Sequence, residues 1–325
     1  MGDEVTGSGS DERPDLARPE TSESSVRPRL AFTLGDVRGI GPEIVAAARA
    51  DPSVSQLCVP VVVGPEGAGV AVDEAVGRWM AGGPDASARA GRFAGKALEA
   101  AVRLALAGDV DGIVTAPLDK AALHAGGYDF PGHTEMLAAL TGTPTTMMLA
   151  SDRLRVVLAT THIALRDVPD AVTPEVIGRA ARTTREYLTR WFGIANPRMA
   201  LCALNPHAGD AGRFGREDDE VLAPAARANG LLGPFPADTV FVRAMRGEFD
   251  VVIAPYHDVG MTAIKVASFG SAVNVTLGLP FPRCSPDHGT AMDIAGRGVA
   301  DPSSFLAAVR LCASIAARPT VAPGR

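Results

Sequence analysis

The chain is short of the features that mark secreted, membrane and nucleic-acid-binding proteins. It has only four cysteines in 325 residues, far apart and without a C-x-x-C pair, so neither a disulfide framework nor a zinc knuckle is indicated. No stretch approaches about 18 uninterrupted apolar residues, and the N-terminus lacks an apolar signal core. Lys and Arg do not cluster, which argues against nucleic acid and membrane partners. We therefore expect a protein of the reducing cytoplasm.

Aromatic residues are also scarce, at 5%, whereas apolar residues make up 46% of the chain and glycine contributes 35 residues. Small apolar side chains suit helices packed closely on a parallel sheet, so the composition indicates an α/β fold. A chain of this length can form one large or two ordinary domains with a full core. Residues 1–27 are rich in Ser, Gly, Pro and acids, and are predicted to form a disordered tail.

The charge is low once this tail is set aside. The formal net charge is −6, but residues 1–27 contain seven acidic residues and three arginines, a balance of −4, which leaves −2 for the rest of the chain. A nearly neutral protein must bind an anionic small molecule with a few well-placed cations.

Apolar runs and helical spacing predict alternating strands and helices. Strands are expected at residues 30–34, 58–64, 111–117, 154–159, 199–204 and 251–254, and helices at 44–50, 88–107, 174–192 and 303–317. Residues 35–43 predict a tight strand-to-helix turn, because their glycines do not match the G-x-G-x-x-G dinucleotide fingerprint. Residues 65–90 lack a strong pattern, and Pro224 must end or restart the helical run at 217–223.

Three of the six histidines directly follow predicted strands. His162 follows 154–159, His207 follows 199–204 and His257 follows 251–254. If these strands are parallel neighbours, the three imidazoles converge at one edge of the sheet. Imidazole is a preferred ligand of zinc and related divalent metals, and three protein ligands leave positions open for a substrate. One such histidine is more often an ordinary loop residue, but three in register favour a metal site.

Other polar residues indicate a binding site for an anion. Residues 250–301 contain apolar strands interrupted by the polar residues Lys265, Asn274 and Arg283. This pattern predicts one wall of a binding site, with a series of solvated loops as the alternative. His133 and Thr134 open a predicted helix, where backbone N–H groups and a hydroxyl can hold an anion, although a plain threonine cap would look the same.

Seven ordered motifs resemble the 4-hydroxythreonine-4-phosphate dehydrogenase family. They are GIGPE at 39–43, GHTE at 132–135, TTH with LRDVPDAVT at 160–173, LNPHAGD at 204–210, GPFPADT at 233–239, YHD at 256–258 and VNVTLGLPFPRCSPDHGTAMDIAGRG at 273–298. The resemblance spans roughly residues 30–318. It implies the fold of the isocitrate and isopropylmalate dehydrogenases, with two α/β domains around a cleft, in a homodimer. We expect a cofactor domain of residues 28–127 and 277–325, and a domain of residues 128–276 for metal, substrate and dimer contacts.

The resemblance also assigns roles to individual residues. His162, His207 and His257 become the ligands of one zinc, magnesium or cobalt ion per subunit, in a site shared across the dimer interface. The implied substrate-binding residues are His133, Thr134, Lys265, Asn274 and Arg283. The cofactor-binding residues are expected to be His288, Gly289, Thr290 and Asp293, with NAD as the cofactor and NADP as the alternative, because a carboxylate at 293 suits an unphosphorylated ribose. Asp238 or a metal-bound water is expected to accept the proton, with Lys265 as the alternative.

The implied reaction is the NAD-dependent oxidation of 4-hydroxy-L-threonine 4-phosphate to 2-amino-3-oxo-4-phosphooxybutanoate, which decarboxylates to 3-amino-2-oxopropyl phosphate, in pyridoxal phosphate biosynthesis. The chain departs from the family at YHDVGMTAIK, where a Gln commonly follows YHD, and at residues 65–90, which look shortened. A phosphorylated four-carbon sugar acid or a cyclic diol dicarboxylate is therefore an alternative substrate. Two alternatives of other classes are a metal-dependent hydrolase, which would leave residues 287–296 without a role, and an inactive binding protein.

Overall fold

The computed structural model describes residues 27–268 and 270–318, so the predicted N-terminal tail lies outside the described residues except for Arg27. Strands and helices alternate along the chain, and the predicted α/β class is confirmed. The strands are β1 (Arg29–Thr33), β2 (Val59–Glu66), β3 (Glu74–Arg78), β4 (Gly112–Thr115), β5 (Thr146–Ala150), β6 (Arg155–Leu158), β7 (Met199–Cys202), β8 (Leu232–Phe235), β9 (Val251–Ala254), β10 (Val273–Leu277) and β11 (Arg283–Pro286).

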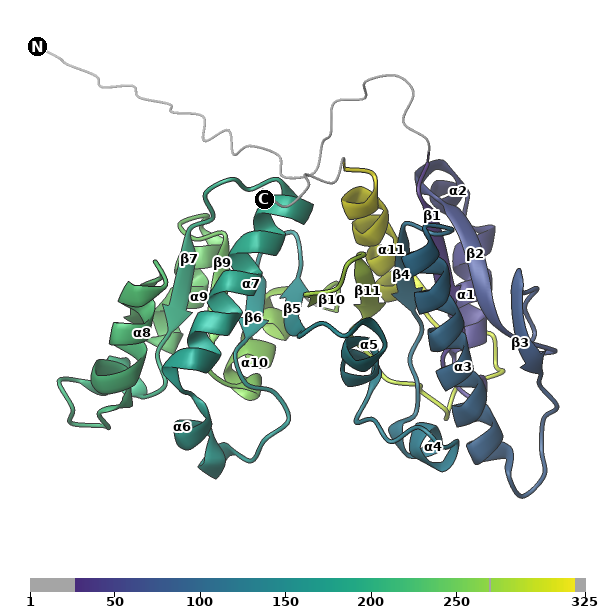
Figure 1. The fold of residues 1–325 in the computed structure, drawn as a ribbon, viewed down its shortest axis with the longest axis horizontal. Helices are drawn as coiled ribbons and strands as arrows, with labels where there is room; N and C mark the ends of the chain where they lie inside the picture. Colours follow the sequence, from purple (N-terminus) through teal and green to yellow (C-terminus); the bar gives the residue numbers. More distant parts are fainter. Residues whose placement is uncertain (1–26, 269, 319–325) are drawn as a thin grey trace, which may run out of the picture.

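The helices cover both faces of the sheet (Figure 1). They are α1 (Gly41–Ala50), α2 (Pro52–Leu57), α3 (Ala86–Ala107), α4 (Lys120–Ala125), α5 (His133–Thr141), α6 (Val168–Ala171), α7 (Pro174–Phe192), α8 (Ala223–Ala228), α9 (Ala237–Met245), α10 (His257–Ser268) and α11 (Ser303–Ala316). Three short turns, η1 (Leu165–Asp167), η2 (Pro206–Gly209) and η3 (Asp218–Leu222), complete the fold. No helix in the described part of the chain is long and apolar enough to span a bilayer.

One eleven-stranded sheet runs through both halves of the protein, in the order β3-β2-β1-β4-β11-β10-β5-β6-β9-β7-β8. The first five of these strands pair in parallel, and so do the last four. Between the two parallel blocks, β10 and β5 run antiparallel to their neighbours. In this arrangement β6, β9 and β7, which precede the three candidate metal ligands, are adjacent strands of one parallel block.

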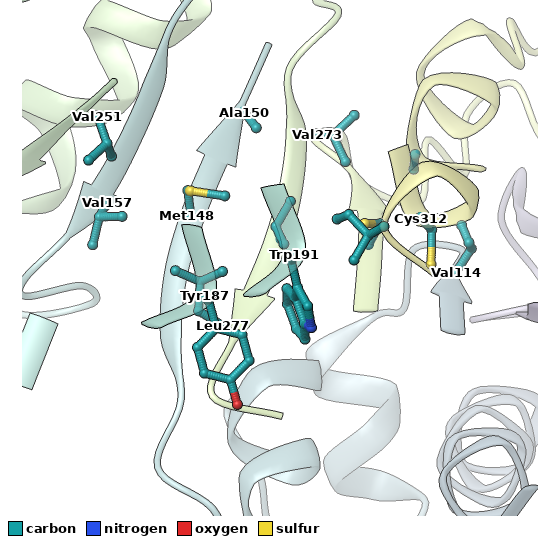
Figure 2. Close-up of a cluster of buried hydrophobic side chains, with 14 of the residues drawn as sticks. Val114, Met148, Ala150, Val157, Tyr187, Trp191, Val251, Val273, Leu277 and Cys312 are labelled. Carbon is teal, nitrogen blue, oxygen red and sulfur yellow. The ribbon is translucent and has the colours of Figure 1, made fainter. Parts of the chain in front are cut away.

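A shared apolar cluster joins the two halves on one face of the sheet. Tyr187 and Trp191 of α7 pack edge to face, with ring centroids 4.5 Å apart, and lie among buried side chains that include Leu277 of β10 and Cys312 of α11 (Figure 2). The Tyr187 hydroxyl donates a hydrogen bond of 3.0 Å to the carbonyl of Leu279. Two separate clusters lie under α3 and α5 in one half, and under α9 and α10 in the other. The eleven-stranded sheet and this apolar cluster both extend across the predicted domain boundaries at residues 127/128 and 276/277. The division into two domains therefore stays a prediction.

The strand-to-helix turn at residues 35–43 forms as predicted. Gly35 has a φ of 63°, and a Cβ atom there would overlap the carbonyl oxygen of Pro117, so the turn requires glycine. α1 then begins at Gly41, with Pro42 in its first turn. β3 could not be predicted, because residues 65–90 lack a strong pattern; it is a mostly exposed edge strand, and its Glu74 accepts a hydrogen bond of 2.6 Å from Arg103 of α3.

Candidate active site

Two of the three candidate metal ligands lie together. β6 and β9 pair in parallel, and the histidines that follow them, His162 and His257, have ring centroids 5.7 Å apart. Burial lowers the pKa of His162, and the ammonium of Lys120 lowers it further, so the ring is neutral at neutral pH. A neutral imidazole is the form that binds a metal, and the pair therefore fits this role.

His207 does not join this pair within one chain, which corrects the expectation that all three imidazoles converge. It lies in η2 with a φ of 55°, and its ring faces Phe214 at a centroid distance of 6.3 Å. The backbone is left-handed at Ala208, Asp210 and Ala211 as well, and this winding turns the chain away after β7. Within residues 27–268 and 270–318, no group of three or more His, Cys, Asp and Glu side chains is placed to hold a metal ion.

Arg283 is a buried cation that pairs with hydroxyl groups instead of a carboxylate. Its side chain is 2% exposed, and it donates hydrogen bonds of 3.0 Å to Thr276 Oγ1 and 2.6 Å to Thr115 Oγ1. Its Nε has no hydrogen-bond partner among the described residues. Burial lowers the pKa of Arg283 to about 10. Because burying a charge without a counter-ion is unfavourable, this guanidinium is suited to receiving an anionic group.

His133 and Thr134 occupy the first turn of α5, as predicted. The helix is capped by Gly132, and no side chain makes a capping bond there, so Thr134 is not an ordinary N-cap. Burial lowers the pKa of His133 well below its usual value, and the charge of Arg283 lowers it further. The start of α5 therefore places a neutral imidazole near the buried guanidinium of Arg283.

The next two predicted substrate contacts differ in their surroundings. Lys265 lies on α10, exposed, with its Nζ 3.6 Å from Asp287 Oδ2. Burial raises the pKa of Asp287, and Lys265 opposes that shift. Asn274 lies on β10, and its buried Oδ1 has no hydrogen-bond partner among the described residues. A carboxamide oxygen in this state is a ready acceptor for a donor group of a ligand.

The predicted cofactor segment rests on the turn before α1. The N–H of Ile40 donates a hydrogen bond of 2.9 Å to the carbonyl of Thr290, and a Cβ on Gly39 would come within 2.6 Å of the same oxygen. Further along, the Glu43 carboxylate accepts hydrogen bonds from the N–H groups of Gly296 and Gly298, the latter at 3.1 Å.

The remaining predicted cofactor residues, His288, Gly289 and Asp293, are exposed. A Cβ built on Gly289 would meet no atom within 4 Å, so the backbone here is open to a ligand. The segment is thus anchored by the GIGPE turn and presents an accessible surface.

Asp238 lies in the first turn of α9, exposed, in an open pocket of about 440 Å³. The same pocket is lined by Tyr256 and by Asp258, which neighbours His257 and approaches its Nδ1 at 3.3 Å. A second pocket, of about 340 Å³, is lined by Thr134, Thr161 and other residues of α5, β5, β6 and α7. Both pockets therefore border residues next to the histidine pair.

Sequence reasoning did not single out two charged residues beside the site, Lys120 and Glu135. Lys120 lowers the pKa of His162, whereas Glu135 raises it, and Glu135 also raises the pKa of Arg283. Each residue had a signal in the sequence. Glu135 is the last residue of the GHTE motif. Lys120 is the third residue after the predicted strand 111–117, a position where α/β proteins commonly carry functional residues.

Fold and site define an α/β protein with a buried arginine, a pair of adjacent imidazoles and a glycine-rich loop anchored to a strand-to-helix turn. The chain belongs to the family described as pyridoxal phosphate biosynthetic protein PdxA, whose model matches residues 68–312. The resemblance to 4-hydroxythreonine-4-phosphate dehydrogenases is thereby confirmed.

Similar proteins of this family are dehydrogenases. The chain is 44% identical to D-threonate 4-phosphate dehydrogenase of Cupriavidus necator, over 91% of this chain and 99% of the relative. It is 50% identical to 4-hydroxythreonine-4-phosphate dehydrogenase of Xanthomonas campestris, over 73% of this chain and 74% of the relative. The crystal structure of 4-hydroxythreonine-4-phosphate dehydrogenase from Klebsiella pneumoniae superimposes with a TM-score of 0.79 and 36% identity, over 91% of this chain and 100% of that one.

Proposed function

We propose that the protein is an NAD-dependent and divalent-metal-dependent dehydrogenase that oxidises 4-hydroxy-L-threonine 4-phosphate. The product, 2-amino-3-oxo-4-phosphooxybutanoate, is a β-keto acid and loses CO2 to give 3-amino-2-oxopropyl phosphate. The observation that carries this proposal is Arg283, a buried guanidinium whose Nε has no hydrogen-bond partner among the described residues and whose charge lowers the pKa of His133 at the start of α5. This arrangement supports a phosphate-binding role, since phosphate accepts several charge-assisted hydrogen bonds at once.

The metal ligands are proposed to come from two copies of the chain. His162 and His257 of one copy would hold a zinc, magnesium or cobalt ion together with His207 of a second copy, which is consistent with His207 standing apart within one chain. A divalent metal supplies a Lewis acid that lowers the pKa of a substrate hydroxyl. The proposed homodimer is thus needed to complete each site, and one ion is expected per subunit.

The chain's own residues bind the substrate and move the proton. Arg283, His133 and Thr134 hold the phosphate, while Asn274 accepts a hydrogen bond from a donor of the substrate. Lys265, which lies beside Asp287, is available to a second anionic group. Asp238 accepts the hydroxyl proton directly or through a water, with Lys265 as the alternative acceptor.

The cofactor is proposed to bind along residues 287–298, which the GIGPE turn anchors. NAD would supply the hydride acceptor, and the backbone of His288, Gly289 and Thr290 would line its binding site. Asp293 is exposed and accepts hydrogen bonds from the adenosine ribose, which favours NAD over NADP. In this proposal residues 28–127 and 277–325 form the cofactor side, and residues 128–276 form the metal, substrate and dimer side.

A second candidate substrate is D-threonate 4-phosphate, because the relative from Cupriavidus necator matches over 91% of this chain and carries that name. It differs from the first substrate by a hydroxyl instead of an ammonium group at C2. A cyclic diol dicarboxylate is a third candidate, since the structure of a terephthalate 1,2-cis-dihydrodiol dehydrogenase from Burkholderia xenovorans aligns with a TM-score of 0.61 and 29% identity. We propose a cytoplasmic location, because the four cysteines are free and buried, as is usual in a reducing compartment.

The experiment that tests the proposal follows the near-ultraviolet absorbance of reduced cofactor. Metal-loaded protein is given NAD and, in turn, 4-hydroxy-L-threonine 4-phosphate, D-threonate 4-phosphate and a cis-dihydrodiol dicarboxylate. We expect reduction of NAD with the first compound and its loss on chelation of the metal. Phosphate release in the absence of NAD would favour a metal-dependent hydrolase, and reduction with only one of the other compounds would reassign the substrate.

A further inference from the structure

The carboxylate of Asp218 holds the chain that leads to His207. Its Oδ1 accepts a hydrogen bond of 2.8 Å from the N–H of Leu204, and its Oδ2 accepts one of 2.9 Å from the N–H of Asn205. These two residues open the LNPHAGD motif just after β7, and Asn205 stands two positions before His207. Asp218 therefore fixes the backbone where the chain leaves the sheet and enters the loop of residues 204–216, here called the His207 loop.

Asp218 is a buried carboxylate without a cationic partner. Asp36 and Asp218 are the two fully buried carboxylates of the described residues, at 0% and 1% exposure. Asp36 pairs with Arg38 at 2.7 Å, whereas no Lys, Arg or His side chain pairs with Asp218 in the part of the chain that the structure describes. Burying an unpaired charge is unfavourable, and here two backbone N–H groups take the place of a counter-ion. Each carboxylate oxygen accepts one of them, which an amide side chain cannot do, since its nitrogen is only a donor.

A second contact on the same segment comes from Glu217. Its Oε2 accepts a hydrogen bond of 2.8 Å from Asn205 Nδ2. Gly215 lies against this pair, because a Cβ atom there would come within 2.5 Å of Glu217 Oε2 and 2.6 Å of Asn205 Nδ2. The N–H of Phe214 also donates a hydrogen bond of 3.1 Å to the carbonyl of Gly209. The His207 loop is thus bonded to its own two ends and closed on itself.

His207 lies in this loop in a backbone conformation that is unfavourable for a residue with a side chain. Its φ is 55°, and Ala208, Asp210 and Ala211 share the left-handed region. Such residues persist where the surrounding structure fixes them, and they gather at functional sites. His207 itself is exposed. The hydrogen bonds of Asp218 and Glu217 therefore fix the base of a strained loop that presents an exposed imidazole.

We propose that Asp218 is a positioning residue for His207, which keeps the His207 loop in the form that reaches the metal site of a second copy of the chain. The inference rests on the proposed function, in which His162 and His257 of one copy bind the metal together with His207 of another. In this role Asp218 acts through the backbone and touches neither metal nor substrate. Its loss should weaken the metal site to which its chain lends His207, and leave the histidine pair of its own chain intact.

The first measurement is the zinc affinity of protein of one kind. Zinc alone is titrated by calorimetry into metal-free wild type, Asp218→Asn and Asp219→Asn. Asparagine has nearly the same shape but keeps one acceptor oxygen of two, so we expect a zinc Kd about tenfold or more higher for Asp218→Asn. Asp219 is the exposed neighbour, and Asp219→Asn should match the wild type. An unchanged Kd for Asp218→Asn would overturn the assignment.

The second measurement separates positioning from a general structural role. Asp218→Asn protein and His162→Ala protein are mixed, dissociated and reassembled, and the zinc sites of wild-type affinity are counted by titration. In each mixed dimer, the histidine pair of the Asp218→Asn chain meets a correctly held His207 from the His162→Ala chain. Random pairing gives about half mixed dimers, each with one intact site of two, so roughly a quarter of the wild-type sites should return.

The matched control is a mixture of Asp218→Asn and His207→Ala proteins. The only His207 in this mixture belongs to the Asp218→Asn chain, so no site of wild-type affinity should form. A defect that spreads through the Asp218→Asn chain would damage its own histidine pair and leave both mixtures without such sites. Sites that return in the control alone would place Asp218 at the histidine pair. Either result would remove Asp218 from the positioning role.

A second variant keeps the test open if Asp218→Asn does not fold. Glu217→Ala removes the acceptor of Asn205 from a half-buried position and should give the same pattern with a smaller change. A wild-type protein that binds zinc, with both variants binding it equally well, would remove Asp218 and Glu217 alone. A wild type that binds no zinc, cobalt or magnesium would defeat the proposed metal function. A mixture of His162→Ala and His207→Ala proteins that regains no sites would defeat the shared site, and this inference with it.

Discussion

The imidazole rings of His162 and His257 lie with their centroids 5.7 Å apart, whereas the ring of His207 packs 6.3 Å from Phe214. The three residues follow three adjacent parallel strands, so their separation arises in the loops and not in the sheet. If a second copy supplies His207, each metal site takes ligands from two chains. Inactive variants should then complement one another.

The first prediction is that His162→Ala and His207→Ala proteins, each inactive alone, regain activity when they are mixed, dissociated and reassembled. In a mixed dimer, one site loses both histidines and the other keeps all three. Random pairing gives about half mixed dimers, each with one intact site of two, so roughly a quarter of wild-type activity should return.

The control for this experiment is a mixture of His162→Ala and His257→Ala proteins. These two histidines belong to the same chain's pair, so every site in every dimer lacks one of them and activity should stay absent. Recovery in the control but not in the first mixture would contradict a shared site with this division of ligands.

The second prediction concerns Arg283, whose buried guanidinium donates hydrogen bonds to the hydroxyls of Thr276 and Thr115. Arg283→Met should weaken binding of phosphorylated substrate by about 2–3 kcal/mol, the range for a lost hydrogen bond to a charged group. The free energy of unfolding without ligand should not fall, because replacing an uncompensated buried charge by an apolar side chain is often neutral or stabilising. Calorimetric titration and urea unfolding measure the two quantities. A variant that is destabilised but binds normally would make Arg283 structural.

The third prediction concerns Glu43, which holds the N–H groups of Gly296 and Gly298. Glu43→Gln keeps one acceptor oxygen but loses the charge, so the loop should be held less firmly. We expect a higher KM for NAD with unchanged metal content and unchanged substrate KM. Glu186→Gln, an exposed position on α7, is the matched control. An unchanged KM for NAD would mean that residues 296–298 are not part of the cofactor site.

Sequence reasoning predicted the elements of the fold better than the geometry of the site. The strand at 251–254 and the helix at 174–192 coincide with β9 and α7, because each has a continuous apolar pattern and clear end signals. The position of His207 could not be predicted, since it depends on left-handed dihedral angles in a short turn. The burial of Arg283 could not be predicted either, because its hydroxyl partner Thr115 is 168 residues away in the sequence.

The fourth prediction is a pH dependence of stability. Burial holds the pKa of His133 well below its usual value, and Arg283 lowers it further. As the pH falls below about 6.5, the unfolded chain takes up a proton at this histidine and the folded protein does not, so the free energy of unfolding decreases. That decrease continues until the pH reaches the folded pKa.

His133→Gln should remove this contribution, so the stability of the metal-free variant should fall less steeply between about pH 7 and about pH 5. Urea unfolding at a series of pH values measures the effect. His124→Gln is the control, because His124 is exposed, 3.4 Å from Asp129. Parallel curves for the wild type and His133→Gln would show that His133 titrates alike in the folded and unfolded states.

The last prediction is cofactor choice. Asp293 is exposed in the loop between β11 and α11, in a segment whose Thr290 carbonyl is tied to the N–H of Ile40 at 2.9 Å. A carboxylate here accepts hydrogen bonds from the ribose hydroxyls of NAD and repels the 2′-phosphate of NADP. We expect a higher kcat/KM with NAD than with NADP, and we expect Asp293→Ser to bring the two values closer, because serine keeps a hydrogen-bonding group but removes the repulsion. Asp301→Ser, in the same loop but with its carboxylate bound to Ser303, is the control and should leave the ratio unchanged. A parent enzyme that prefers NADP, or a ratio unmoved by Asp293→Ser, would show that Asp293 does not face the ribose.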